Sequence, residues 1–311
     1  MERDMTVGTP WKIILNFTIP IVIGNIFQQF YSMVDTVIVG KFVGTKALAA
    51  VGSTGTIGFL ILGFLMGLTA GFTVLTSQRF GAGDMPGMRK TVLSVIVSVV
   101  MTVISMAFMK PLLILMNTPA DIFQDAYKYI MIICAGIFTQ VMYNLLAGIL
   151  RALGNSKTPL YFLLFSAVLN IVLDLVLIIV FHLGAAGAAY ATVIAQGVSA
   201  LLCLVYIIKK VPILKLDRWD FKLDGHLVRQ QLAIGFPMAL QYSITAIGAM
   251  MVQAALNVLG SVHVAAFTAA NKIEQVATQV YVALGTTMAT YCAQNMGAGK
   301  VKRISRGFRA T

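Results

Sequence analysis

Two aspartates inside long apolar stretches have the setting most suggestive of chemistry. Asp35 lies near the end of an apolar run that starts at Trp11, and Asp174 lies in a run that starts at Pro159. A carboxylate inside such a segment costs on the order of several kcal/mol unless it faces water or a partner, so acids in these positions are usually functional.

Polar side chains precede each aspartate at helical spacing. Residues three, four or seven apart share one face of an α-helix, so each aspartate stands in a narrow polar stripe on an otherwise apolar helix. The alternative is that these amides and hydroxyls only hold helices together. The stripes are Ser166, Asn170 and Asp174 in one segment, and Gln28, Tyr31, Ser32 and Asp35 in the other.

The two aspartates fit three kinds of chemistry. Two carboxylates in a poorly hydrated site cannot both ionise at low cost, so such a pair can load and release a proton. Alternatively, both ionise around Na⁺, and Asn170 and Thr192 add neutral oxygens. Two acids that share a proton and activate water would make an intramembrane aspartyl protease. Neither Asp35 nor Asp174 has the glycine-flanked context of such enzymes.

Three further residues in apolar segments need an explanation. Lys272 and Glu274 are two residues apart, so they point to different sides of a helix and cannot pair. We expect Glu274 to line a cavity, with structural pairing as the alternative. Pro20 removes one backbone hydrogen bond and permits a kink; we expect a hinge there, although a static packing kink is also common.

The composition identifies the setting of these residues. The chain has 311 residues, 59% hydrophobic and 11% charged, with a mean hydropathy of +0.87. A soluble domain is about 45–50% apolar and about a quarter charged, so we expect an all-α polytopic membrane protein. Charge-poor windows predict eight spans. They lie near residues 11–40, 47–78, 88–110, 124–150, 158–181, 186–208, 227–259 and 262–294.

The basic residues predict the orientation. Loops on the side of the amino terminus hold 18 Lys and Arg, and the opposite loops hold 4. The amino terminus is therefore expected in the cytoplasm, with the chain in the cell membrane. This alternation explains the net charge of +12 without nucleic-acid binding. The three cysteines and three histidines are scattered, so we expect no metal site beyond a possible Na⁺ at the acids. A helical rise of about 1.5 Å per residue places both acids in the outer half of the membrane.

The chain also contains an internal repeat. Nine residues recur at a shift of 216 without a gap, and Pro20 recurs as Pro237, one residue out of step. The copies are six predicted spans apart, so they run in the same direction and form a parallel repeat. The nine are Gly44, Ala49, Ala50, Ile57, Leu68, Gln78, Gly81, Ala82 and Gly83, matched by Gly260, Ala265, Ala266, Ile273, Leu284, Gln294, Gly297, Ala298 and Gly299.

The repeat predicts the domain organisation. We expect one six-helix bundle at 1–208, a cytoplasmic linker at 209–229, and the first two helices of a second bundle at 230–311. Thr311 corresponds to Val95, early in the third helix of the first copy. We therefore expect a C-terminally truncated protein in which four further helices would complete the second bundle, and we do not expect the 311-residue form alone to transport.

An ordered set of these features resembles the multidrug and toxic compound extrusion (MATE) transporters. The resemblance covers the whole chain, and no single motif in it is diagnostic. The matching features are Pro20, the run Gln28 to Asp35 to Gly40, Ala49-Ala50-Val51-Gly52, Gln78 with Gly81-Ala82-Gly83, Arg151 with Gly154, Asn170 with Asp174, and Thr192.

The resemblance to the DinF-like prokaryotic branch implies roles for particular residues. It implies that Asp35, Asn170, Asp174 and Thr192 bind the coupling H⁺ or Na⁺. Gln28, Tyr31 and Asn144 would then line the adjoining drug cavity. Another branch carries an essential Glu on its seventh helix, which is absent here because residues 230–259 contain no acid.

The function expected from this resemblance is cation-coupled export across the cytoplasmic membrane. The substrates would be small, amphipathic and often cationic organic compounds, with no organic cofactor and a monomeric full-length protein. Two alternatives remain. A lipid-linked glycan flippase of a related fold would need a basic lumen, and the predicted spans hold only Lys272. The intramembrane protease gives the repeat no role.

Overall fold

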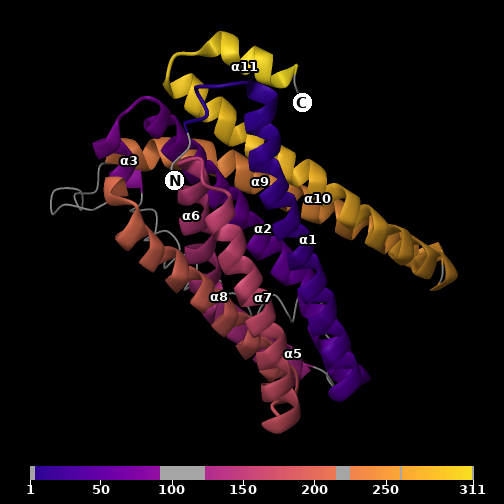
Figure 1. Ribbon diagram of the computed structural model, residues 1–311. Helices are drawn as coiled ribbons and strands as arrows, with labels where there is room; N and C mark the ends of the chain where they lie inside the picture. Colours follow the sequence, from indigo (N-terminus) through magenta and orange to yellow (C-terminus); the bar gives the residue numbers. More distant parts are fainter. Residues whose placement is uncertain (1–3, 92–122, 215–224, 260, 310–311) are drawn as a thin grey trace.

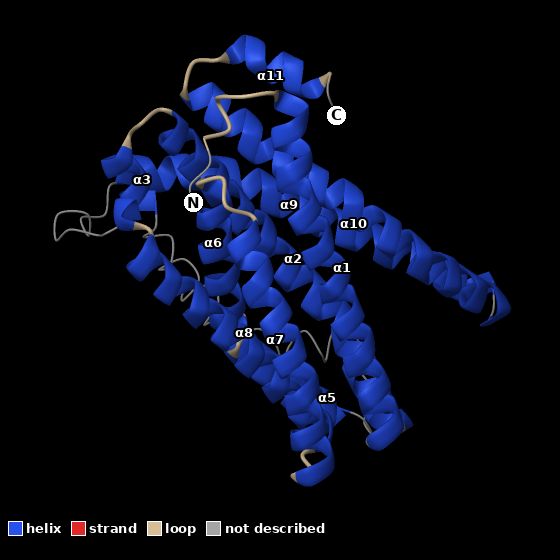
Figure 2. Ribbon diagram, viewed as in Figure 1, coloured by secondary structure: helices blue, strands red, loops and turns tan. Residues whose placement is uncertain are grey.

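The computed structural model describes residues 4–91, 123–214, 225–259 and 261–309 (Figure 1). Within these ranges the regular elements are all helices (Figure 2), which confirms the predicted all-α class. The predicted span near 88–110 lies almost entirely outside the described residues.

Seven of the eight predicted spans coincide with helices. Two short helices, α3 (Met85–Thr91) and α11 (Val301–Phe308), follow α2 and α10. The long helices are α1 (Pro10–Phe42), α2 (Thr45–Gly81), α5 (Phe123–Ala135) with α6 (Ile137–Ala152), α7 (Lys157–Leu175) with a π-helical turn at Val176–Val180, α8 (Gly184–Lys210), α9 (Gly225–Leu259) and α10 (Ser261–Gly297).

Most of these helices can cross a membrane by length and composition. Five segments of the described residues are long and apolar enough to do so. They are α1, Leu60–Gly81 of α2, α7 with its π-helical turn, α8 and Gly225–Ala249 of α9. The pair α5 and α6 adds a sixth span that is bent by 41°. α10 has 37 residues but is not among them, because polar residues interrupt its first half.

The first bundle is held together by apolar packing and by two cross-helix hydrogen bonds. Leu146, Leu150 and Cys203 belong to a buried cluster between α6 and α8. The Ser166 hydroxyl on α7 donates to the Ala195 carbonyl on α8 at 2.8 Å, and Ser199 returns a bond from α8 to Phe162 at 3.1 Å. These bonds fix the rotation of α7 about its axis and therefore the direction of its polar stripe.

The two copies of the repeat meet in a reciprocal contact. Gly81 of α2 lies against the backbone of Gln294 of α10, and Gly297 of α10 lies against that of Gln78 of α2. The 216-residue shift exchanges these two contacts. A two-fold relation between the copies requires such reciprocity.

The end of the molecule where α1 begins and α10 ends is called the inner end below; it carries α11 and both chain ends (Figure 1). Here residues 4–9, the N-terminal strap, bond to the second copy of the repeat. The Met5 amide donates to Gln294 Oε1 at 2.9 Å, and Gln294 Nε2 donates to the Ala152 carbonyl at the end of α6. Further bonds join Lys300 Nζ to the Thr6 carbonyl at 3.0 Å and Arg303 Nη2 to the Met5 carbonyl at 3.3 Å.

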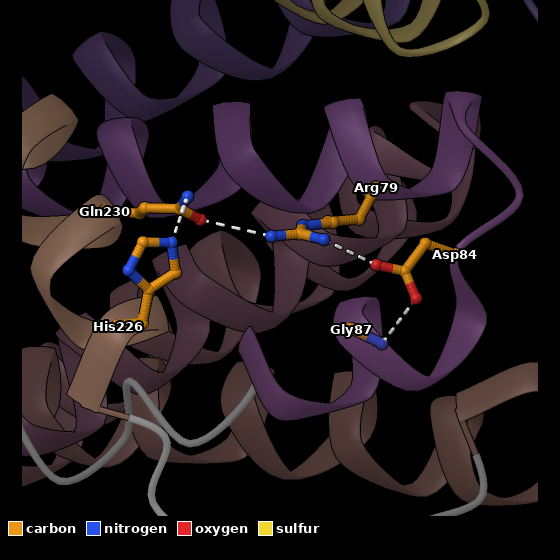
Figure 3. Close-up of polar contacts among 5 residues, drawn as sticks. All are labelled: Arg79, Asp84, Gly87, His226 and Gln230. Carbon is orange, nitrogen blue, oxygen red and sulfur yellow. Dashed lines mark hydrogen bonds and ion pairs between the residues drawn. The ribbon is translucent and has the colours of Figure 1, made fainter.

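A second polar connection at the inner end joins α2 to the start of α9 (Figure 3). Arg79 donates to Asp84 Oδ2 at 2.6 Å and to Gln230 Oε1 at 3.1 Å. Gln230 in turn donates to His226 Nε2 at 3.1 Å, and the Gly87 amide donates to Asp84 at 2.9 Å. The repeat places Asn295 at the position of Arg79 and Lys300 at that of Asp84. Arg79, Asn295 and Lys300 each bond to the other copy, whereas the bonds of Asp84 to Arg79 and Gly87 lie within its own copy.

Candidate functional site

The two predicted aspartates face each other across α1 and α7. Their carboxyl groups lie close enough for a side-chain interaction. Asp174 is fully buried at the C-terminal end of α7, directly before the π-helical turn, and Asp35 is partly buried. π-helical turns often occur at functional sites because they re-aim neighbouring side chains.

Most polar atoms around the pair lack a hydrogen-bond partner. Of the seven buried side-chain atoms without one in the described residues, six belong to Asp35, Asn170, Asp174 and Gln196, and they include both Asp174 oxygens. Buried polar atoms are nearly always bonded in native proteins, so a local cluster of exceptions needs a cause. Carboxylate and amide oxygens are the donors that hold a proton or a hard cation. We call these four residues the acid-pair site.

Two residues not predicted from the sequence border this site. Gln196, 5% exposed on α8, donates from Nε2 to the Tyr31 hydroxyl at 3.3 Å. Tyr129 on α5 lies within electrostatic range of Asp35, Asp174 and Tyr31. Gln196 stands one turn after Thr192 on α8, and this spacing was the only sequence signal for it. Tyr129, two residues after Tyr127 on α5, had no such signal.

The remaining residues predicted for the cation site and the cavity are dispersed. Thr192 is half-buried and makes no side-chain hydrogen bond within the described ranges. Asn144 donates to the Gln140 carbonyl of its own helix at 2.9 Å and lines a small hollow between α2 and α6. Gln28 interacts with Tyr31 and so lies beside the acid-pair site. Pro20 is buried within an uninterrupted α1.

A groove of about 250 Å³, lined by polar and apolar side chains, runs between α1 and α10. Ser32, which was predicted to share the stripe of Asp35, faces this groove together with Thr36 and Gln275. Glu274 is exposed on α10, next to Gln275, and does not line the groove. α1 and α10 cross near the inner end and diverge beyond it (Figure 1), so the groove lies in the diverging part.

These features define a class of protein. Two parallel-repeat helical units meet at a groove, and a buried acid pair lies beside it. This is the arrangement of a secondary transporter. Within the described residues, no three His, Cys, Asp or Glu side chains gather as metal ligands would.

Comparison with known proteins identifies the family. The MatE family profile matches residues 20–176 and 233–311. The chain is 34% identical over 312 residues to the probable multidrug resistance protein YpnP of Bacillus subtilis (strain 168), covering 97% of this chain and 68% of that protein. It is 27% identical over 310 residues to a FAD transporter of Shewanella oneidensis, covering 96% and 68%.

Solved structures give the same result. The fold is similar to the outward-facing conformation of a multidrug resistance MATE family transporter of the MOP superfamily, with a TM-score of 0.89 and 26% identity, covering 99% of this chain and 69% of that one. It is also similar to a MOP superfamily transporter from Pyrococcus furiosus Vc1, with a TM-score of 0.91, 25% identity and coverages of 99% and 69%. The chain belongs to the MatE family of multi-pass membrane transporters, which are not enzymes.

Proposed function

We propose that this protein couples the inward movement of H⁺ or Na⁺ to the export of amphipathic, often cationic organic compounds. The observation that carries the proposal is the acid-pair site, where Asp35 and Asp174 lie together with oxygens that have no hydrogen-bond partner in the described residues. A proton or Na⁺ bound there would satisfy these oxygens and neutralise the buried charge.

The position of Asp35 suggests how cation binding acts on the groove. Its helix, α1, carries the acid toward α7 and carries Ser32 and Thr36 toward the groove. A cation that binds one arrangement of α1 and α7 better than another shifts the population between them. Pro20 lies about four helical turns before Asp35 on α1. It removes one backbone hydrogen bond of this helix and is the proposed hinge. We assign Gln28 and Tyr31 to the boundary between the cation site and the groove.

The gradient suffices for such export. A membrane potential of about 150 mV corresponds to about 3.5 kcal/mol per charge, or roughly a 300-fold concentration ratio. In this scheme the amino terminus is cytoplasmic, the groove opens outward, and the full-length protein works as a monomer in the cell membrane.

The lining of the groove also bears on the alternatives. Its described residues include hydroxyls, amides and apolar side chains but no Lys or Arg, which does not suit the diphosphate of a lipid-linked glycan. Membership in a transporter family removes the protease alternative.

Dye export tests the proposal. Proteoliposomes of the full-length protein receive a pH gradient alone or a Na⁺ gradient alone, and loss of a fluorescent cationic dye is followed. Asp35→Asn and Asp174→Asn should each abolish gradient-driven export while protein yield in the membrane stays normal. Asp4→Asn, which removes an exposed acid outside the site, should export normally. Gradient-dependent export that survives in both site variants would refute the assignment.

A further inference from the structure

A second sizeable cavity lies outside the transport site. It measures about 660 Å³ at the inner end, between the start of α1, the α6–α7 turn and the N-terminal strap. Its polar lining is unlike that of the groove, because it includes two lysines, Lys12 and Lys157. Neither lysine pairs with an acid within the described ranges, where Arg79 and Asp84 form the ion pair.

Two helix N-termini meet at this cavity. α1 begins at Pro10 and α7 begins at Lys157, and residues of both first turns line it. Neither helix has an acid in its first turn, and the side chains of the N-cap residues Thr9 and Ser156 make no capping hydrogen bond. Each N-terminus carries about half a positive charge, so the lysines and both helix ends produce positive potential in the same space.

A buried hydroxyl adds a specific polar contact. Ser156, 5% exposed, stands at the N-cap position of α7 without bonding the helix and lines the cavity. Its neighbour Asn155 is engaged instead with the Thr158 hydroxyl at 2.9 Å and the Thr158 amide at 3.1 Å. Ser156 is therefore available to donate a hydrogen bond to an anion.

The lining also contains one acid, Asp4, and one of its oxygens is bonded within the strap. Asp4 Oδ1 accepts a hydrogen bond from the Thr6 amide of the strap at 2.7 Å. Trp11 is 50% exposed beside Lys12, as is typical of an aromatic residue at the membrane interface. An anion in this cavity would therefore lie beside two lysines, one of which is next to an exposed tryptophan.

We propose that this cavity binds a phosphate group, supplied by the headgroup of an anionic phospholipid of the inner leaflet. The assignment to the inner leaflet rests on the orientation proposed above. Met5 and other strap residues form one wall of the cavity, and Gln294 of the second copy holds Met5 in place. The binding wall is thus complete only while the inner end is closed, so the lipid stabilises that state.

Tryptophan quenching tests this site. Residues 1–311 hold two tryptophans, and Trp11 becomes the sole reporter once Trp219 and any tryptophan in the rest of the full-length protein are changed to Phe. The full-length protein is placed in phosphatidylcholine vesicles that contain a small fraction of brominated phosphatidylglycerol or brominated phosphatidylcholine. Brominated phosphatidylglycerol should quench Trp11 more strongly. The double variant K12Q/K157Q should lower the apparent affinity for it about 30-fold, since each lysine near an anionic surface contributes about 1 kcal/mol.

The matched control is K209Q/K210Q, which removes the same charge from exposed lysines at the end of α8, and it should retain the preference. Equal quenching by both lipids in the parent, or equal loss in both double variants, would refute the site. Reversal of the preference by inorganic phosphate would keep the site and assign it to soluble phosphate compounds. Dye export in the same vesicles reports on the transport function separately.

Discussion

Gly71 of α2 and Gly235 of α9 meet backbone to backbone. The repeat relates this contact to the one between Thr287 of α10 and Thr18 of α1, whose hydroxyls lie 2.9 Å apart. One crossing is thus closed by two glycines and its counterpart by two hydroxyls. We infer that α2 and α9 form the tighter pivot between the copies, while α1 and α10 are free to diverge along the groove.

The pivot predicts a strong effect from one methyl group. In Gly71→Ala the new Cβ would meet backbone atoms of Gly235, which cannot move aside as a side chain would. We expect a loss of about 1–3 kcal/mol in stability, measured as a lower melting temperature in detergent. Gly63→Ala, two turns earlier on α2, is the matched control because its Cβ would make an ordinary contact with Tyr242. Equal melting of the two variants would contradict the pivot.

Tyr129 predicts a role for α5 in coupling. Tyr129→Phe removes a hydroxyl near Asp35 and Asp174 without changing the volume of the ring. The expected loss in gradient-driven export is about threefold to tenfold, or roughly 1 kcal/mol, because the hydroxyl dipole near the two acids is lost. Tyr127, two residues earlier, stacks on Phe123. The variant Tyr127→Phe is the matched control and should export normally. Unchanged export in Tyr129→Phe would remove this tyrosine from the mechanism.

Local periodicity predicted one side of the acid-pair site better than the other. Spacings of four place Ser166, Asn170 and Asp174 on one buried face of α7. On α1 the stripe divides, because Tyr31 turns toward Gln196 whereas Ser32 turns toward the groove. A helix that borders two polar spaces presents polar residues on two faces, and sequence spacing alone does not separate them.

The residues missed by the sequence depend on tertiary contacts. Tyr129 and Gln196 join the site only because α5 and α8 pack around α1 and α7, and the only indication within either helix is the four-residue spacing of Gln196 from Thr192. Nothing in the sequence of residues 4–9 indicates a strap, yet its backbone is bonded by Gln294. Gln294 was singled out only as a repeated residue, and the repeat did not reveal its partners.

Gln294 predicts how the inner end opens. It is fully buried and bonds both the Met5 amide and the Ala152 carbonyl, so Gln294→Leu leaves two backbone groups without partners. Each such group costs about 1–3 kcal/mol in the closed state, whereas water can satisfy both once the strap is released. The closed state should therefore lose population while the bundle stays folded.

Labelling of the strap measures this shift. Thr6 is 7% exposed, so a maleimide reaches Thr6→Cys, in a background without the native cysteines, mainly when the strap is released. Gln294→Leu should raise the labelling rate about tenfold or more. Gln275→Leu, an exposed glutamine of the same helix, should leave it unchanged. If both variants label at the parent rate, the strap does not close the inner end, and opening there must depend on the Arg79–Gln230 connection instead.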